Sequence, residues 1–570
     1  MALGSFDRPL AAEQLSSTRF DVLVVGGGIT GCGVALDAAA RGMRTALIER
    51  GDLASGTSSR SSKLVHGGLR YLQQREVGLV RDALAERQRL LANARHLVTV
   101  QPFLIPVFGS DGLFPRRVAR ALGGALWMYD LSGGLRIGHR HRRVSAQEAA
   151  AQLPCLDPDR LAGAYLYHDA RADDARLTLA IARTAALDHG AVVCTRATLT
   201  GRDGTTAQVA LDDGTGGTTT VTVRAEVVVN AGGVWAEAVE STAGRSTVGR
   251  IRPAKGVHAT VPADRLPAGA AVVLPVRSDG RSVFVVPWGS HTYIGTTDTA
   301  YDGPLDEPTC TAADLDYLLE AVNATTDAGL TAADVSATWA GLRPLVEGDA
   351  ERTADLSRRH TITAADGMVT VVGGKLTTYR TMAAEAVDAA FELLPPSVRG
   401  SVRRRSPTAE LRLRGSADPP GRKGDDRDDL LDGLDTRRPP AGDGDLLEHL
   451  VGRYGTEARV VLAMIDRDHA LGEPLVRGLP YVRAEVAYAA RYEQALTVRD
   501  VLERRTRARS LDALATAEAA DDTAGLLATA LGRDDAWATA EAADVRASIT
   551  AERRAAGLSV PEPLSRDAAT

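Results

Sequence analysis

The glycine-rich turn at residues 26–31 constrains the fold of this chain more than any other feature. An apolar segment at 20–25 precedes it, a run of small residues follows it, and a second apolar segment lies at 45–49. A strand, a glycine turn, a helix and a second strand within about 30 residues make the βαβ unit that binds dinucleotides. The sequence therefore predicts an α/β fold that begins with a nucleotide-binding unit.

The residues of this turn have separate physical roles. The first glycine permits a tight turn, the second lets backbone approach a pyrophosphate, and the third lets helix and strand pack closely. The helix N-terminus attracts the anion, and an acidic residue at the end of the second strand can accept hydrogen bonds from ribose hydroxyls. FAD and NAD satisfy this unit equally well. The predicted cofactor contacts are Gly26, Gly28, Ile29, Thr30, Gly31 and Glu49.

A stretch rich in serine and glycine at 57–71 follows the second strand. Its hydroxyls suit a pyrophosphate or the edge of a flat ring, and its glycines let backbone lie against such a ring. A flexible loop is the alternative, but Leu64 and Val65 are too apolar for a solvated linker. His66 is a candidate base, with a core histidine that only holds the loop as the alternative, and Arg70 is a candidate anion ligand.

A second glycine turn at 373–374 follows an apolar strand and precedes a long helix. It is not a phosphate-binding loop of the Walker type, because Val369 stands at the position of that loop's first glycine and Leu376 follows Lys375. Its helix N-terminus suits the pyrimidine edge of a flavin, which gains negative charge on reduction. An ordinary capped helix is the alternative.

Most basic residues of this chain are arginines, and only a few are lysines. Arg343 and Arg358 are close enough in sequence to bind one dianionic phosphate through forked hydrogen bonds, although surface positions are the alternative. Three of the four lysines lie in glycine- or serine-rich motifs, which favours sites that need a compact ammonium over chance retention. The four lysines among the 67 basic residues are Lys63, Lys255, Lys375 and Lys423.

Bulk properties exclude several classes of protein. A net charge of −6 gives no overall attraction to nucleic acid, and we expect no nucleic-acid partner. Four cysteines without a C-x-x-C pair predict neither disulfides nor a zinc site, so no metal is expected. The basic stretch 139–143 is expected to be solvated. No signal-peptide pattern and no run of 18 apolar residues occurs, so we expect a cytoplasmic protein without a spanning helix.

The remaining segments suggest further parts. Residues 415–445 are dense in Pro, Gly, Asp and Arg and read as a linker, whereas 446–555 has the composition and periodicity of a helical domain. The basic and apolar segment 116–129, with aromatic residues at one end, can lie on an anionic membrane surface. A packed amphipathic helix is the alternative there.

Eight motifs together give a family resemblance. They are DVLVVGGGITG, TSSRSSKLVHGGLRYL, ADDARL, NAGGVW, AKGVH, IGTTDT, GLRPL and GGKLTTYR. In this combination the chain resembles FAD-dependent, aerobic-type, quinone-linked glycerol-3-phosphate dehydrogenases over roughly 20–395 and again near 450–510. HGGLRYL together with GGKLTTYR is specific to that family, whereas GxGxxG alone is not.

The resemblance implies a glutathione-reductase-like FAD-binding domain, an inserted mixed-sheet substrate domain and a C-terminal α-helical cap domain. The implied segments are 18–76, 154–245 and 341–400 for the FAD-binding domain, 77–153 and 246–340 for the substrate domain, 401–445 for a linker and 446–555 for the cap.

The resemblance also implies site residues. The implied catalytic residues are His66, Lys375 and Arg343, and the implied substrate ligands are Arg70, Tyr71, Arg343, Arg358 and Lys375, with the register between Arg358 and Arg359 open. The implied FAD contacts beyond the first turn are Thr57, Ser58, Ser61, Ser62, Lys63, Leu64, Gly232, Gly374, Lys375, Leu376 and Thr377.

The implied reaction is oxidation of sn-glycerol 3-phosphate to dihydroxyacetone phosphate by hydride transfer to FAD. Electrons would pass to membrane quinone, with the protein peripheral on the inner face of the cell membrane. The alternatives are a glycerol-3-phosphate oxidase that uses oxygen, a flavin amine or amino-acid oxidase that binds a carboxylate, and a non-enzymatic FAD-binding redox sensor. A homodimer formed through the helical domain is a further hypothesis.

Overall fold

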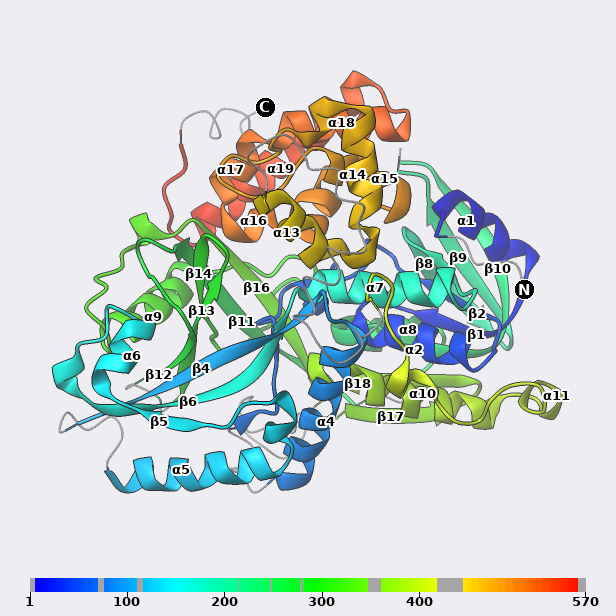
Figure 1. Cartoon of the computed structure of the whole chain (residues 1–570). Coiled ribbons are helices and arrows are strands. Elements are labelled where there is room, and N and C mark those ends of the chain that lie inside the picture. The colour runs from blue at the N-terminus through cyan, green and yellow to red at the C-terminus, as the bar shows by residue number, and fades with distance from the viewer. Residues whose placement is uncertain are drawn as a thin grey trace.

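The computed structural model describes residues 6–69, 76–109, 116–214, 216–246, 249–276, 279, 281–346, 360–417 and 444–561. Two sheets and a helical domain make up this part of the chain, with the helical domain above both sheets (Figure 1). The predicted fold class is confirmed.

The first sheet carries the βαβ unit. Its strand order is β17-β18-β10-β1-β2-β7, and the β8-β9 hairpin extends it from β10. β1 lies parallel to both β2 and β10, and its residues from Phe20 onward are buried on both faces of the sheet, as its mainly apolar sequence predicts. The strands are β1 (Arg19–Val25), β2 (Thr45–Ile48), β7 (Val192–Cys194), β8 (Ala197–Asp203), β9 (Thr206–Asp212), β10 (Thr218–Asn230), β17 (His360–Ala365) and β18 (Met368–Gly373).

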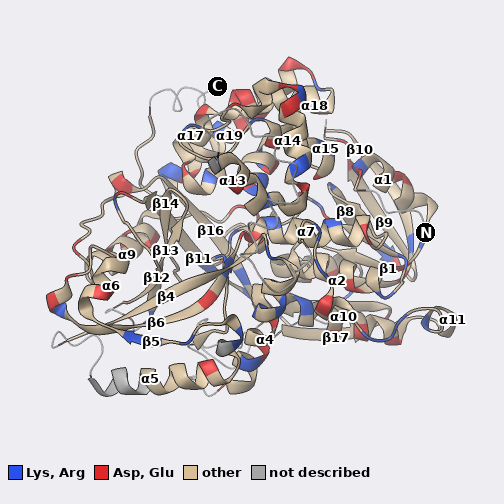
Figure 2. Cartoon of the chain, viewed as in Figure 1, with Lys and Arg blue, Asp and Glu red and all other residues tan. Residues whose placement is uncertain are grey.

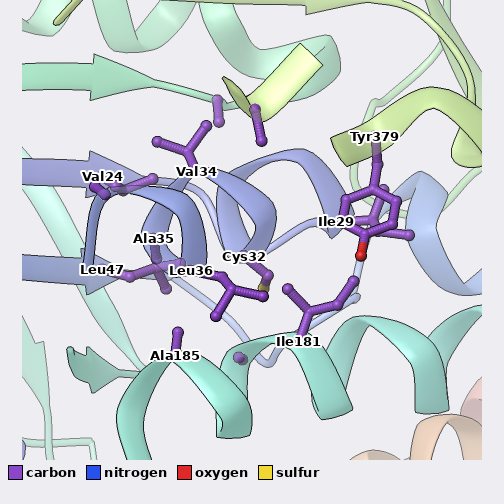
Figure 3. Close-up of a cluster of buried hydrophobic side chains, with 14 of the residues drawn as sticks. Val24, Ile29, Cys32, Val34, Ala35, Leu36, Leu47, Ile181, Ala185 and Tyr379 are labelled. Atoms are coloured by element: carbon purple, nitrogen blue, oxygen red, sulfur yellow. The ribbon is translucent and has the colours of Figure 1, made fainter. Parts of the chain in front are cut away.

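Helix α2 (Ile29–Ala40) lies at the centre of the core beside this sheet. Figure 3 shows Val24 and Leu47 of the sheet on one side of it and Ile181 of α7 (Asp174–Leu187) on another. α10 (Tyr379–Leu393) also packs on it. A Cβ at Gly33 would lie 2.9 Å from the Tyr379 ring, so the small residues of α2 are what let three helices share this space.

The second sheet is mixed. Its order is β15-β11-β14-β13-β12-β4-β6-β3, with β16 on β11 and β5 on β6. β4 lies parallel to β12 but antiparallel to β6. The strands are β3 (Leu64–Val65), β4 (Val98–Phe108), β5 (Arg142–Val144), β6 (Leu161–Ala172), β11 (Ile251–Pro262), β12 (Ala271–Pro275), β13 (Ser282–Trp288), β14 (His291–Gly295), β15 (Thr299–Ala300) and β16 (Ala337–Val346).

Sheet membership corrects the expected segment boundaries. We expected the substrate domain to consist of residues 77–153 and 246–340. However, β3, all of β6 and the end of β16, which lie outside these two segments, also belong to the second sheet. β3 pairs with β6 through Leu64 and Arg171, a hydrogen-bonded partnership between residues too far apart in sequence for a local pattern to reveal. The chain therefore crosses between sheets near 63 and again near 173.

The expected linker also begins as packed structure. Arg41 of the first domain donates to the Arg404 carbonyl, and the Ser406 hydroxyl donates to Asp37. Leu413 N donates to the Asn93 carbonyl at 2.8 Å. Residues 401–417 thus pack against α2 and Asn93, while the expected linker residues 418–443 lie outside the described part of the chain.

Helices occupy the expected cap. They are α13 (Gly444–Tyr454), α14 (Ala458–Arg467), α15 (Ala484–Tyr492), α16 (Ala508–Leu511), α17 (Ala513–Glu518), α18 (Ala520–Leu531) and α19 (Asp535–Ala555), with a π-helical turn, η11 (Asp500–Arg505), between α15 and α16. The helices from α15 onward share one apolar core, which includes Val486, Leu502, Leu527 and Ile549 and also Ala337 of β16. α13 and α14 contribute to a second core.

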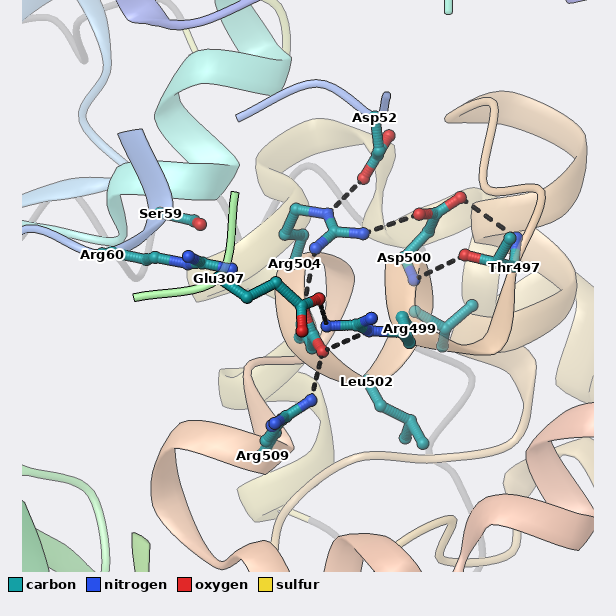
Figure 4. A network of polar contacts seen from close by, with 12 residues as sticks. Asp52, Ser59, Arg60, Glu307, Thr497, Arg499, Asp500, Leu502, Arg504 and Arg509 are labelled. Atoms are coloured by element: carbon teal, nitrogen blue, oxygen red, sulfur yellow. Dashed lines mark hydrogen bonds and ion pairs between the residues drawn. The ribbon is translucent and has the colours of Figure 1, made fainter. Parts of the chain in front are cut away.

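A buried network of charges joins the cap to the loop after β2 (Figure 4). The Asp52 carboxylate accepts from Arg504 Nε at 2.6 Å and from both terminal nitrogens of Arg505 at 2.7 and 2.8 Å. Arg504 also donates to Asp500 at 2.6 Å. Burial disfavours ionised Asp500, but Arg196 and Arg504 outweigh burial and hold its pKa below the usual value.

Replacing Asp52 by Asn should therefore destabilise the protein. The change leaves two buried guanidinium groups without their shared carboxylate, a loss of roughly 3–5 kcal/mol in the free energy of unfolding. Urea unfolding followed by circular dichroism measures it.

Glu518→Gln is the matched control, because its partner Arg477 and Glu518 itself are 80% and 60% exposed. An exposed pair contributes about 0–1 kcal/mol. Equal losses in the two variants would contradict a structural role for the buried network.

Candidate active site

The first glycine turn has the predicted geometry. Gly26 has φ +113°, and a Cβ there would lie 2.6 Å from the Ala231 carbonyl oxygen. A Cβ at Gly31 would lie 1.9 Å from the Gly26 oxygen. At Gly28, the N-cap of α2, only Ser58 Oγ lies within reach of such an atom, at 3.3 Å. The turn is thus crowded on the side of the sheet and open at the N-terminus of α2, the position predicted for the pyrophosphate.

Glu49, which directly follows β2, holds the glycine turn in place through hydrogen bonds. Its two carboxylate oxygens accept from Gly27 N at 2.6 Å and Gly51 N at 2.7 Å. Burial raises the pKa of Glu49, and these two amides act against that rise. The carboxylate therefore ties the glycine turn to the end of β2. A hydrogen bond from a ribose hydroxyl to Glu49 stays a prediction.

Gly232 lies beside the same turn. Its amide donates to Asn230 Oδ1 at 3.0 Å, and its nitrogen would be 3.2 Å from a Cβ on Gly26. The Asn230 amide donates in turn to the Ala236 carbonyl at 2.9 Å. The end of β10 is thereby held against the first glycine turn, and a contact of Gly232 with the cofactor stays a prediction.

Two hydroxyls of the serine-rich loop connect it to neighbouring elements. Thr57 Oγ1 donates to the Leu342 carbonyl on β16 at 2.5 Å. Ser58 Oγ accepts from Ile29 N, the first helical amide of α2, at 2.9 Å. The loop thus bridges the two sheets at the point where the predicted cofactor would lie, and the contacts of these hydroxyls with FAD stay predictions.

The next two serines contact protein partners as well. Ser61 donates from its amide and its hydroxyl to Asp174 Oδ2, at 3.0 and 2.7 Å. Ser62 Oγ lies 2.8 Å from His258 Nε2. Both hydroxyls thus fix the course of the loop into β3, which begins at Leu64.

Lys63 differs most from its expected environment. We expected a cofactor contact, but its ammonium lies 4.3 Å from the Trp339 ring centre and 5.1 Å from that of Trp288. Asp174 is 3.7 Å away. Burial lowers the pKa of Lys63 to about 7, although Asp174 acts in the opposite direction. Cation–π contact and one carboxylate thus replace the hydration of this ammonium.

The two most specific motifs meet in space. His66 N donates to Thr377 Oγ1 at 3.2 Å, across 311 positions of sequence. Leu376 and Thr377 belong to a short 3-10 turn, η7 (Leu376–Thr378), whose N-cap is Lys375. A Cβ at Gly374, which has φ +83°, would lie 2.3 Å from the Met382 sulfur. The chain segments of His66 and Lys375 are therefore brought to one region, and the roles of the two side chains stay predictions.

Arg343 lies on β16, the strand whose Leu342 carbonyl accepts from Thr57. Its guanidinium donates to Asp298 Oδ1 at 3.1 Å and to Thr296 Oγ1 and the Thr297 carbonyl at 3.3 Å. The side chain is 24% exposed, so it is accessible to a solute while being held in place. The predicted ligands Arg70, Tyr71, Arg358 and Arg359 lie outside the described residues.

Sequence reasoning did not select His258. It lies on β11 and stacks on Trp339 with ring centres 4.6 Å apart. Burial, with Lys63 and Arg343 nearby, lowers its pKa well below the usual value, so its imidazole is neutral. The only signal was the AKGVH motif, since a histidine in an apolar strand otherwise resembles a core residue. Within the described residues, no group of three or more His, Cys, Asp or Glu could hold a metal ion.

The pKa of Lys63 predicts a pH dependence of stability. A base whose folded pKa of about 7 lies below its ordinary 10.5 binds fewer protons in the folded state over that interval. Wild-type stability should therefore rise with pH from about 7 to 10 relative to a Lys63→Met variant. Urea midpoints across this range measure the difference.

Lys63→Arg is the control. An arginine stays charged over this whole pH range, so the stability of this variant should change with pH as little as that of Lys63→Met. Parallel curves for wild type and both variants would show that Lys63 keeps its proton on folding.

Comparison with known proteins agrees with this geometry. Residues 21–380 match the family described as FAD dependent oxidoreductase, and residues 406–538 match the C-terminal domain of alpha-glycerophosphate oxidase. Glycerol-3-phosphate dehydrogenase 2 of Mycobacterium tuberculosis is 41% identical over 515 residues, covering 89% of this chain and 84% of its own length. Aerobic glycerol-3-phosphate dehydrogenase of Staphylococcus aureus is 37% identical over 397 residues, covering 68% and 70%.

Solved structures share the fold. Glycerol-3-phosphate dehydrogenase from Bacillus halodurans, complexed with FAD, superposes with a TM-score of 0.74 at 30% identity and covers 95% of this chain and 97% of that one. L-alpha-glycerophosphate oxidase from Mycoplasma pneumoniae, at 19% identity and a TM-score of 0.51, shares the fold over 65% of this chain and 95% of its own. The chain therefore belongs to the family of FAD-dependent glycerol-3-phosphate dehydrogenases.

Proposed function

We propose that this protein oxidises sn-glycerol 3-phosphate to dihydroxyacetone phosphate and passes the electrons to membrane quinone. One observation carries the site assignment: the loop with His66 is hydrogen-bonded to Thr377, beside Lys375. The names of its relatives in Mycobacterium and Staphylococcus support the substrate.

The cofactor and two side chains have separate roles in the proposed reaction. When bound, FAD supplies the acceptor for the hydride that leaves the carbinol carbon. His66 is the side chain suited to take the hydroxyl proton near neutral pH. The Lys375 ammonium stabilises negative charge that develops on the substrate oxygen.

Arg343 binds the phosphate in this proposal. Two acceptors of its guanidinium, the Thr296 hydroxyl and the Thr297 carbonyl, are neutral and 3.3 Å away, and a phosphate dianion is a stronger acceptor than either. Binding the remote phosphate fixes the carbinol carbon in place, and the orientation gained appears at the reacting centre.

The test is substrate-driven loss of flavin colour without oxygen. Glycerol 3-phosphate should bleach the wild-type protein. In Arg343→Ala the concentration needed should rise roughly 10- to 100-fold, because one charge-assisted contact is worth about 1.5–3 kcal/mol. Bound FAD per chain should stay at the wild-type value.

Arg265→Ala is the control, an exposed arginine of the same domain that pairs with Asp334. Bleaching by glycine or sarcosine instead would support an amino-acid oxidase, and bound FAD that no substrate bleaches would support a redox sensor. Reoxidation of the reduced protein by oxygen faster than by a quinone analogue would support an oxidase.

Helix α5 (Arg116–Leu131) is the proposed membrane contact. It runs along an outer edge of the molecule (Figure 1), and its described part is almost free of charge (Figure 2). Trp127, Met128 and Leu131 are 50%, 46% and 73% exposed. Among the described residues, no helix is long and apolar enough to span a membrane. An amphipathic helix at the interface supports access to quinone from the inner face of the cell membrane. A homodimer through the cap stays a prediction.

The double variant Trp127→Ser, Leu131→Ser should lose most of its binding to vesicles of anionic lipid. Burying each apolar side chain contributes about 1.5–3 kcal/mol, so the partition coefficient should fall at least about tenfold. Turnover with a water-soluble acceptor should not change.

Leu393→Ser is the control, since Leu393 is 38% exposed at the end of α10. Vesicle cosedimentation measures binding, and equal binding of wild type and the double variant would remove α5 from the proposal.

A further inference from the structure

A buried chain of hydrogen bonds ends on the loop that carries His66. Gly67 N donates to Tyr129 Oη at 2.9 Å, and Tyr129 Oη donates to Asp169 Oδ2 at 2.5 Å. Arg87 NH1 donates to the other oxygen of Asp169, also at 2.5 Å. The side chains of Arg87, Tyr129 and Asp169 are all at most 2% exposed. No step of the proposed reaction uses these three side chains directly.

Three elements fix the position of the phenol. Arg87 comes from α4 (Val77–Asn93), Tyr129 from α5 and Asp169 from β6. Arg87 also donates to the carbonyls of Gly133 and Gly134, just beyond α5, at 3.5 and 3.4 Å. A guanidinium that bonds both the carboxylate and the chain end of α5 leaves the phenol little freedom to move.

The direction of each bond follows from the chemistry. Burial raises the pKa of Tyr129 well above its usual value, and Asp169 raises it further, so the phenol stays protonated. Its one proton goes to the carboxylate, and its oxygen is left to accept from the Gly67 amide. The network therefore has one arrangement of donors and acceptors.

The loop is seated tightly against this phenol. A Cβ at Gly67 would lie 2.7 Å from both Tyr129 Oη and Leu84 Cδ2. On its other side, the preceding residue donates from its amide to Thr377 Oγ1 at 3.2 Å. The amides of two successive loop residues are thus held by different parts of the structure: that of His66 by Thr377, beside Lys375, and that of Gly67 by Tyr129 of α5.

We propose that Tyr129 is a positioning residue for the reaction: its hydroxyl, aligned by Asp169 and Arg87, sets the orientation of His66 toward the substrate. The inference rests on the proposed function, because it takes His66 to act on the substrate. Without the hydroxyl, Gly67 N loses its hydrogen bond to the phenol, and the loop gains freedom beside the residue that takes the proton. A small displacement at that point lowers the rate more than it weakens substrate binding.

Tyr129→Phe tests the proposal with two readouts. Turnover per bound flavin should fall about 10- to 100-fold, while KM and FAD content stay within about twofold of wild type. Amide hydrogen exchange in the segment 64–69 should become faster, because an unpaired amide exchanges through smaller openings.

Tyr167→Phe is the matched control. Its ring lies 6.0 Å from that of Tyr129 and stacks on Phe103 at 5.2 Å, in the same buried cluster. The Gly67 amide donates to the hydroxyl of Tyr129 and not to that of Tyr167. Removal of its hydroxyl should leave turnover and exchange at the wild-type level.

The outcomes separate this proposal from the proposed function. His66→Ala with unchanged turnover would refute the role of His66 as the base, whatever Tyr129 does. If Tyr129→Phe lowers turnover equally in the wild-type and His66→Ala backgrounds, Tyr129 does not act through His66. Unchanged exchange, or faster exchange with wild-type turnover, would likewise overturn the proposal. A purely structural role would lower the unfolding midpoint and leave turnover per flavin unaltered.

Discussion

The shared carboxylate of Asp52 is the interaction on which much of this architecture depends. It neutralises two buried guanidinium groups of the cap, Arg504 and Arg505, at the start of the loop that carries the serine-rich motif. Arg507 of the cap donates to Asp174, which also accepts from Ser61. Because buried charges are tolerated only when paired, the cap, the loop and helix α7 must be assembled together. The helical domain thus holds both ends of the loop between β2 and β3 in place.

The candidate site residues lie where segments of the two sheets meet. Thr57 bonds the loop to β16 of the second sheet, and Thr377 bonds the His66 loop to the second glycine turn of the first. Lys375 therefore sits between β18 and η7, His66 directly follows β3, and Arg343 lies within β16. Rigid support of this kind is what a reaction needs when positioning supplies a large part of the rate.

Local pattern was enough to predict the unit around Gly26, because strand, turn and helix are adjacent in sequence and each glycine has a steric reason. The family resemblance placed His66 and Lys375 in one site; the bond from His66 N to Thr377 joins their two motifs, and the roles of the two side chains stay predictions. The pairing of β3 with β6, the aromatic surroundings of Lys63 and the bond from Gly67 to Tyr129 were not predictable, because each joins residues that only the tertiary fold brings together. Sequence periodicity carries no information about such partners.

The parallel pairing of β10 with β18 has a consequence for synthesis of the chain. β1 and β10 can pair as soon as the first 230 residues have been made, but β18 (Met368–Gly373) completes that side of the sheet and α10 then covers α2. A nascent chain on the ribosome therefore carries an open strand edge and an uncovered apolar helix for more than a hundred further residues. Such surfaces are what chaperones recognise and what aggregates in their absence. This side of the first sheet is consequently completed late in synthesis, once β18 has left the ribosome.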